Sequence, residues 1–184
     1  MRVVGGRWRG RTLAAPKSQA IRPTADRLRE SLFNILVHAY GDPIDNARVL
    51  DLFAGTGALG IEALSRGASF ALFVDDGVEA RALLRGNVEA LGLGGSTKIF
   101  RRDATKLGPV SPLDPFTLAF LDPPYGKGLA EQALTSARAG GWLASGATVV
   151  VEEATDAGFA APEGFEELER RDYDDTEFVF LRLR

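Results

Sequence analysis

The sequence has no cysteine and only one histidine, and these scarcities exclude several kinds of site. Without cysteine the chain can form neither disulfides nor a thiolate metal centre, and His38 alone is too little for a transition-metal site. No apolar stretch reaches membrane-spanning length, and the arginine-rich N-terminal residues lack the apolar core of a secretion signal. We therefore expect a cytoplasmic protein that uses no metal and contacts no membrane.

Length and charge distribution indicate one domain with a basic end. The 184 residues, 45% of them hydrophobic, suit one domain with a buried core, and we expect it to span residues 1–184. The formal net charge is −3, yet residues 1–30 hold 8 Lys/Arg and only 2 Asp/Glu. Clustered arginines suit phosphate backbones. The basic arm that we expect over residues 1–22 therefore favours a nucleic-acid partner.

Residues 1–15 alternate loosely around a centre rich in Gly and Arg and predict a short β-hairpin. Arginine runs are often only solvated arms, but an aromatic residue and several glycines among them favour RNA contact. The predicted RNA-binding residues are Arg7, Trp8, Arg9 and Arg11.

Strand and helix patterns alternate along the rest of the chain. The expected helices are 24–40, 58–66, 78–91 and 129–139, the first capped by Thr24. The expected strands are 48–53, 70–74, 97–101, 116–121, 148–151, 165–173 and 177–183. This order predicts an α/β fold, a doubly wound, Rossmann-like, mostly parallel seven-stranded sheet with an antiparallel C-terminal edge.

The stretch DLFAGTGALG, residues 51–60, predicts a strand, a tight turn and a helix. Gly55 and Gly57 allow turn geometries and a close approach of the backbone to a ligand, and Gly60 lets the helix pack on the strand. A nucleotide-like ligand suits such a loop. The motif alone is weak evidence, because Gly-rich turns also occur where nothing binds.

An acidic residue follows or ends four of the expected strands: Asp51, Asp75, Asp103 and Asp122. Ligands of doubly wound sheets bind at this edge. Asp75 has the spacing from the Gly loop at which a carboxylate accepts ribose hydroxyls, while Asp76 suits the cap of the next helix. Asp103 can accept a hydrogen bond from the exocyclic amine of adenine or act as a turn residue.

The sequence DPPY, residues 122–125, follows an expected strand that is apolar except for Thr117. Two prolines stiffen this segment, so the Asp122 carboxylate, the Pro123 carbonyl and the Tyr125 ring project in fixed directions. Two acceptors can take both N–H groups of a planar amine while the ring stacks on its base, which aims the nitrogen lone pair at an electrophile. The alternative is a surface turn, which explains neither the apolar strand nor the Gly loop.

The order of these motifs resembles class I S-adenosylmethionine-dependent amino-methyltransferases. Four segments further resemble the RsmD family, which methylates a guanine N2 amine of small-subunit (16S) ribosomal RNA: RWRGRTLAAP (7–16), RPTADRLRESLFNIL (22–36), DLFAGTGALGIEALSRGA (51–68) and DPPYGKGL (122–129). The resemblance implies the methyltransferase form of the fold and S-adenosylmethionine as cofactor. It also implies that Asp122, Pro123 and Tyr125 hold the guanine.

The cofactor-binding residues expected on this resemblance are Arg22, Thr24, Asp51, Phe53, Gly55, Gly57, Asp75, Asp103 and Ala104. The expected partner is ribosomal RNA within a small-subunit assembly particle, and we expect a monomer. Three alternatives remain open at this stage. They are an adenine-N6 or protein-glutamine methyltransferase, an NAD-dependent oxidoreductase that uses the same Gly loop, and a noncatalytic RNA-binding module.

Overall fold

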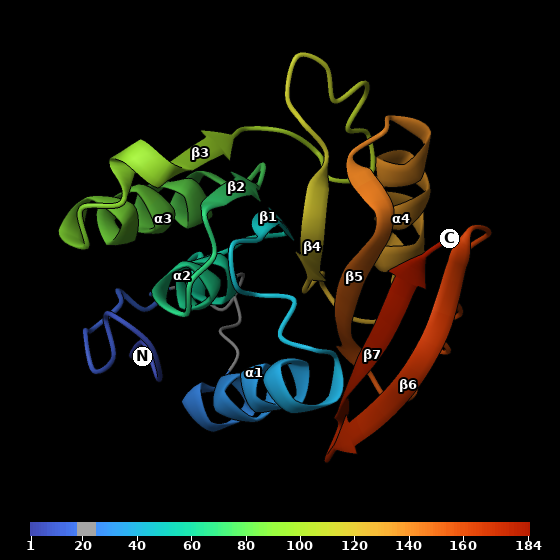
Figure 1. The fold of residues 1–184 in the computed structure, drawn as a ribbon, viewed down its shortest axis with the longest axis horizontal. Coiled ribbons are helices and arrows are strands. Elements are labelled where there is room, and N and C mark those ends of the chain that lie inside the picture. The colour runs from blue at the N-terminus through green and yellow to red at the C-terminus, as the bar shows by residue number, and fades with distance from the viewer. Residues whose placement is uncertain (18–24) are drawn as a thin grey trace.

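The computed structural model describes residues 1–17 and 25–184 (Figure 1). In these residues the helices are α1 (Asp26–Ala39), α2 (Ala58–Ser65), α3 (Val78–Ala90), the short 3₁₀ helix η1 (Gly94–Ser96) and α4 (Leu129–Ala139). The strands are β1 (Arg48–Leu52), β2 (Phe70–Val74), β3 (Thr97–Phe100), β4 (Phe116–Leu121), β5 (Leu143–Ala154), β6 (Phe165–Tyr173) and β7 (Thr176–Leu183).

The strands form one seven-stranded sheet in the order β3-β2-β1-β4-β5-β7-β6. Strands β1 to β5 run parallel, and β7 lies antiparallel between β5 and β6. The chain order reverses between β1 and β4, which makes their carboxyl ends the place where ligands bind in such sheets. The predicted doubly wound sheet with an antiparallel edge is confirmed.

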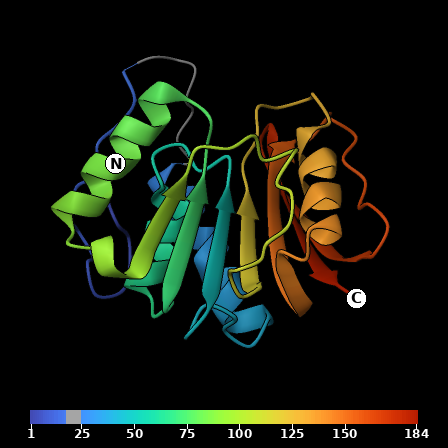
Figure 2. The ribbon, with the colours of Figure 1, turned by 90° about the horizontal axis from the view of Figure 1, so that it is seen from above.

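Alternating strand residues face two separate cores. Val49 of β1 belongs to the core packed by α1, α2 and α3, whereas its neighbour Leu50 belongs to the core packed by α4. This is the period of two that a strand imposes on its side chains. Figure 2 shows α4 at the β5 side of the sheet, away from β3.

Helix α2 is buried along its whole length, Glu62 included. The sheet covers one side, and residues 3–8 are bonded to the other. Val4 N and Gly5 N donate to the Glu62 carboxylate over 2.9 Å each, and Trp8 N donates to Ser65 Oγ over 2.9 Å. The carboxylate also pairs with Arg29 of α1, which is itself fully buried. The N-terminal residues are therefore packed against the domain through their backbone.

Several boundaries differ from the sequence predictions. The expected hairpin over residues 1–15 is present but short: Arg2 and Thr12 form an antiparallel bridge, and backbone hydrogen bonds join residues 1–3 to residues 10–13. Helix α1 has Ala25 as its N-cap, without a side-chain hydrogen bond, and the predicted cap Thr24 lies outside the described residues, as does the predicted end of the arm at residue 22. Strand β5 is three times as long as the expected strand 148–151: it begins at Leu143, which pairs with β4 before a register shift, and residues 152–154 continue it by pairing with β7. No helix among the described residues is long and apolar enough to span a bilayer.

Candidate functional site

A cavity of about 1180 Å³ opens at the carboxyl ends of β1, β2 and β4. Its walls include eight of the predicted site residues: Asp51, Phe53, Gly55, Asp75, Asp103, Asp122, Pro123 and Tyr125. Typical small-molecule pockets hold about 300–1,000 Å³. The cavity therefore has room for one bound molecule and part of a second.

Two predicted cofactor residues in the described part of the chain, Gly57 and Ala104, are not among its walls. Gly57, in the Gly loop, has a φ of +82°, and an added Cβ there would stand 2.3 Å from Leu84 Cδ1. Ala104 is only 4% exposed and packs in the core beneath α4. Arg22 and Thr24 lie outside the described residues.

The loop between β1 and α2 depends on unusual backbone angles and close packing. Phe53, which has a side chain, takes a positive φ of 57°, and Gly55 takes 59°. A Cβ on Gly60 would lie 2.4 Å from Phe73 Cε1 of β2. The predicted role of Gly60 in bringing the helix close to the sheet is confirmed, with β2 as the nearest contact.

Asp75 joins the two loops that border the cavity. Its Oδ2 accepts from Gly55 N over 2.9 Å, and its Oδ1 accepts from Gly77 N over 2.8 Å. The predicted cap role of Asp76 is wrong, because Gly77 is the N-cap of α3 and no side chain caps it. Gly77 N is instead bonded to Asp75, which stands two residues earlier as in an Asx-turn.

Asp51 is buried at the bottom of the cavity, and its Oδ2 accepts from Gly60 N over 3.0 Å. Burial raises the pKa of Asp51 well above its usual value, and the charge of Asp75 adds to the rise, while the hydrogen bond from Gly60 opposes it. Asp103 is exposed, and the hydrogen bonds from the Thr105 hydroxyl and backbone N–H lower the pKa of Asp103. The turn role considered for Asp103 is present in the structure and leaves its carboxylate at the cavity wall.

The cavity is strongly acidic. Six carboxylates line it, and Lys127 is the one basic residue among the described wall residues. In a cavity with low-dielectric walls such a charge pattern attracts cations and opposes anions. A ligand with a positive charge near its centre suits this site, whereas a pyrophosphate does not.

The loop at residues 122–126 is tied to the strands beside it. The Tyr125 hydroxyl donates to Glu152 Oε2 over 2.9 Å and lies 2.9 Å from Thr176 Oγ1, and Gly126 N donates to Glu153 Oε1 over 2.9 Å. Burial and the charge of Glu152 raise the pKa of Tyr125, so its hydroxyl stays protonated near neutral pH. The loop is thus held in place from β5 and β7.

Three groups at this site were missed by sequence reasoning. Glu152 and Glu153 form an acidic pair at the carboxyl end of β5. Two acids directly after an apolar run were the signal in the sequence that could have identified them. Val78 is 75% exposed, unusual for a large apolar side chain, and lines the cavity beside Asp75 and Asp76. An apolar residue two positions after Asp76, at the start of a helix, was the corresponding signal.

The predicted RNA-binding residues lie apart from the cavity wall. Arg7, Arg9 and Arg11 are exposed and Trp8 is partly buried. The Arg7 guanidinium lies 5.2 Å from the centre of the Trp8 ring, and Arg11 Nη2 donates to the Ala90 carbonyl over 3.0 Å. All three arginines are therefore accessible to a partner that approaches from solvent.

Comparison with known proteins adds family membership to this geometry. Residues 1–182 match the family described as conserved hypothetical protein 95. Ribosomal RNA small subunit methyltransferase D from Escherichia coli K12 is 38% identical over 159 residues, which cover 86% of this chain and 77% of that protein. The protein of the same name from Haemophilus influenzae is 34% identical over 167 residues, covering 90% and 84%.

Solved structures agree with these sequence relatives. The structure of yhhF from Escherichia coli has a TM-score of 0.84 and 32% identity, and it covers 100% of this chain and 98% of its own. A hypothetical protein from Thermus thermophilus, TTHA0928, has a TM-score of 0.74 and 33% identity, with 98% of both chains covered. The resemblance found in the sequence is confirmed, and the chain belongs to the conserved hypothetical protein 95 family, which is the RsmD family of methyltransferases.

Proposed function

We propose that this protein transfers a methyl group from S-adenosylmethionine to the exocyclic N2 amine of a guanine in small-subunit ribosomal RNA. One observation carries the proposal: the Gly loop after β1 and the segment Asp122–Tyr125 after β4 line the same acidic cavity. A donor site and an acceptor site thus share one volume. Methylation of ribosomal RNA is also the activity that the relatives' names state.

The residues present suit the cofactor. Bound S-adenosylmethionine supplies a methyl group on a positively charged sulfur, and a cavity with six acids favours that charge. Each Asp75 oxygen accepts one backbone N–H and keeps a second lone-pair site for a ribose hydroxyl. Asp103 would accept from the adenine amine, and the exposed Val78 side chain offers an apolar surface for its ring. Asp51 and the loop at Phe53–Gly55 would border the methionine part.

The acceptor amine would be held by the residues after β4. Asp122 and the Pro123 carbonyl each take one N–H of the guanine amine, and the Tyr125 ring lies against the base. As the nitrogen took the methyl group and the carbon–sulfur bond broke, positive charge would develop on the nitrogen, and the Asp122 carboxylate would stabilise that charge until the amine releases a proton to water. Holding both reactants at a fixed distance supplies much of the rate gain, so no covalent intermediate is needed.

The basic arm would position the RNA. Its exposed arginines lie outside the cavity, and contact with phosphates needs no base recognition. We propose that the substrate is ribosomal RNA in a partly assembled small-subunit particle. We further propose that the protein acts as a monomeric single domain in the cytoplasm.

One experiment tests the reaction. Protein, labelled S-adenosylmethionine and either free ribosomal RNA or small-subunit particles are incubated, and the modified nucleoside is mapped. We expect N2-methylguanine, with more transfer to particles. Methyl on adenine N6 or on a protein glutamine amide would overturn the base assignment. Thermal melting with S-adenosylmethionine or NAD is the cofactor control, and stabilisation by NAD alone would favour an oxidoreductase.

A further inference from the structure

Asn87 is a polar residue that the proposed reaction does not use, although it is buried in the last turn of α3 with 3% of its surface exposed. Asparagine is a poor residue for a helix interior, because its amide competes for backbone hydrogen bonds. A buried amide must also be satisfied on both its oxygen and its nitrogen. Its presence there calls for specific partners.

Both ends of the side chain have a backbone partner from a different part of the protein. Oδ1 accepts from Ala14 N over 2.7 Å, and Nδ2 donates to the Thr56 carbonyl over 2.9 Å. A backbone N–H can only donate and a carbonyl can only accept, so the orientation of the amide is determined. Asn87 thus links the end of the arm to the Gly loop.

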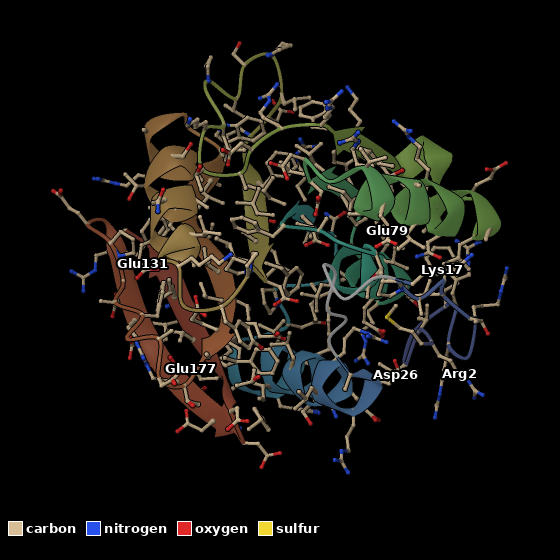
Figure 3. All side chains as sticks on the ribbon, turned by 180° about the vertical axis from the view of Figure 1, so that it is seen from behind. Arg2, Lys17, Asp26, Glu79, Glu131 and Glu177 are labelled. Carbon is tan, nitrogen blue, oxygen red and sulfur yellow. The ribbon has the colours of Figure 1, made fainter. Side chains whose placement is uncertain are left out.

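The two linked segments are both walls of the cavity. Thr56 lines it directly, and Ala15 and Pro16 line it from the residues that follow Ala14. Figure 3 shows Lys17, just beyond them, on the same side of the molecule as Glu79 of α3, which also borders the cavity. Asn87 therefore supports two walls from behind without lining the cavity itself.

The same arm carries the exposed arginines proposed to contact RNA. A second tie, from Arg11 Nη2 to the Ala90 carbonyl at the C-terminal end of α3, lies three residues from Asn87. Through these hydrogen bonds, a ligand that fixes the Gly loop and a ligand that fixes the arm would both restrain α3. Whichever ligand binds second would have less conformational freedom left to remove, so the two ligands would bind cooperatively.

We infer that Asn87 is a positioning residue that couples cofactor binding in the cavity to RNA binding on the basic arm. The inference rests on the proposed function, because it takes S-adenosylmethionine as the cavity ligand and RNA as the arm ligand. Linkage requires the effect to be reciprocal: the cofactor strengthens RNA binding by the same factor by which RNA strengthens cofactor binding.

The test measures that factor. The affinity for a ribosomal RNA fragment is determined with and without saturating S-adenosylhomocysteine, which occupies the cavity without reacting. For the wild type we expect the cofactor product to tighten RNA binding about fivefold or more, the lower end of common coupling factors. For Asn87→Ala the factor should fall to about one, while RNA affinity without the product stays within about twofold of the wild type.

Two further variants separate the halves of the link. Asn87→Asp keeps an oxygen for Ala14 N but loses the donor to Thr56, and Ala14→Pro removes the arm's N–H while leaving α3 intact. Either change alone should abolish the coupling, and both remain informative if Asn87→Ala does not fold. Val88→Ala, on the neighbouring buried position of α3, is the control for simple destabilisation and should keep the wild-type factor.

The possible outcomes distinguish this inference from the proposed function. If the wild type binds S-adenosylmethionine and methylates RNA but shows no coupling, or if Asn87→Asp and Ala14→Pro keep the wild-type factor, the inference alone is overturned. A loss of coupling in Val88→Ala equal to that in Asn87→Asp would also overturn it. If the wild type neither binds the cofactor nor transfers methyl, the proposed function fails and the inference fails with it.

Discussion

Asp75→Asn tests whether one carboxylate holds both loops of the cofactor site. Asp75 presents two oxygens to two backbone N–H donors, Gly55 N at 2.9 Å and Gly77 N at 2.8 Å. An asparagine side chain has the same shape but only one oxygen. Whichever way it turns, one N–H faces an NH₂ group, and one loop loses its acceptor.

The size of the effect follows from the kind of bond that is lost. A hydrogen bond to a charged group contributes about 1.5–3 kcal/mol. For a chain of this length each kcal/mol corresponds to about 2–4 °C in melting temperature, so the variant should melt roughly 3–12 °C below the wild type. If the freed loop also loses its ribose contact, S-adenosylmethionine affinity should fall roughly 10- to 150-fold, by the same 1.5–3 kcal/mol.

The assay is thermal and urea unfolding of both proteins, with cofactor affinity measured by calorimetry. Asp76→Asn is the matched control, because Asp76 is exposed and borders the same cavity. Its stability should stay within about 0.5 kcal/mol of the wild type. An Asp75→Asn protein with wild-type melting would refute the bridging role. A loss of cofactor affinity in Asp76→Asn but not in Asp75→Asn would mean that Asp76, and not Asp75, holds the ribose.

Three further changes address the acceptor, the RNA surface and the cavity floor. Asp122→Ala should abolish methyl transfer and leave cofactor affinity nearly unchanged. A large loss of cofactor affinity with normal single-turnover transfer would mean that Asp122 lines the cofactor pocket and does not hold the acceptor. Replacing Arg7, Arg9 and Arg11 together by Ala should leave cofactor binding intact. The slope of log RNA affinity against log salt concentration should become shallower by about 2–3. An unchanged slope with a lower melting temperature would mean that the three arginines only pack the arm against the rest of the protein. Asp51 has a raised pKa in the fold, so its ionisation costs stability as pH rises above the unfolded value of 3.8. Asp51→Asn should therefore gain stability relative to the wild type as pH rises above about 4 in urea titrations, and a difference that stays constant with pH would contradict the burial argument.

The sequence predicted best those elements that local patterns determine. The strands Phe70–Val74 and Phe116–Leu121, apolar except for Thr117, and the helix Leu129–Ala139 have the predicted bounds. Each has one strong period or a continuous buried run between clear turn residues. Strand β5 was predicted too short, because its first residues contain only Leu143 as a paired position, before a register shift, and residues 152–154 are ordered by pairing with β7.

The contacts that complete the site were beyond local patterns. Glu62, Asn87 and Glu152 each bond to residues far away in the sequence, at separations of 58, 73 and 27 positions. Glu62 gave a partial signal, since a single acid in an otherwise apolar helix must find partners when the helix is buried. Which partners it finds depends on how the arm folds back, and no periodicity in the sequence encodes that.

The position of β7 in the sheet has a consequence for how the protein is made. During synthesis the N-terminal parts of a chain emerge first and begin to fold first. Strand β6 pairs with β7 alone among the described strands, and one edge of β5 is covered by β7. Until residues 176–183 have left the ribosome, β5 presents an open apolar edge and β6 has no partner. Nascent chains stalled before that point should be held by chaperones or aggregate, because unpaired edges recruit other strands.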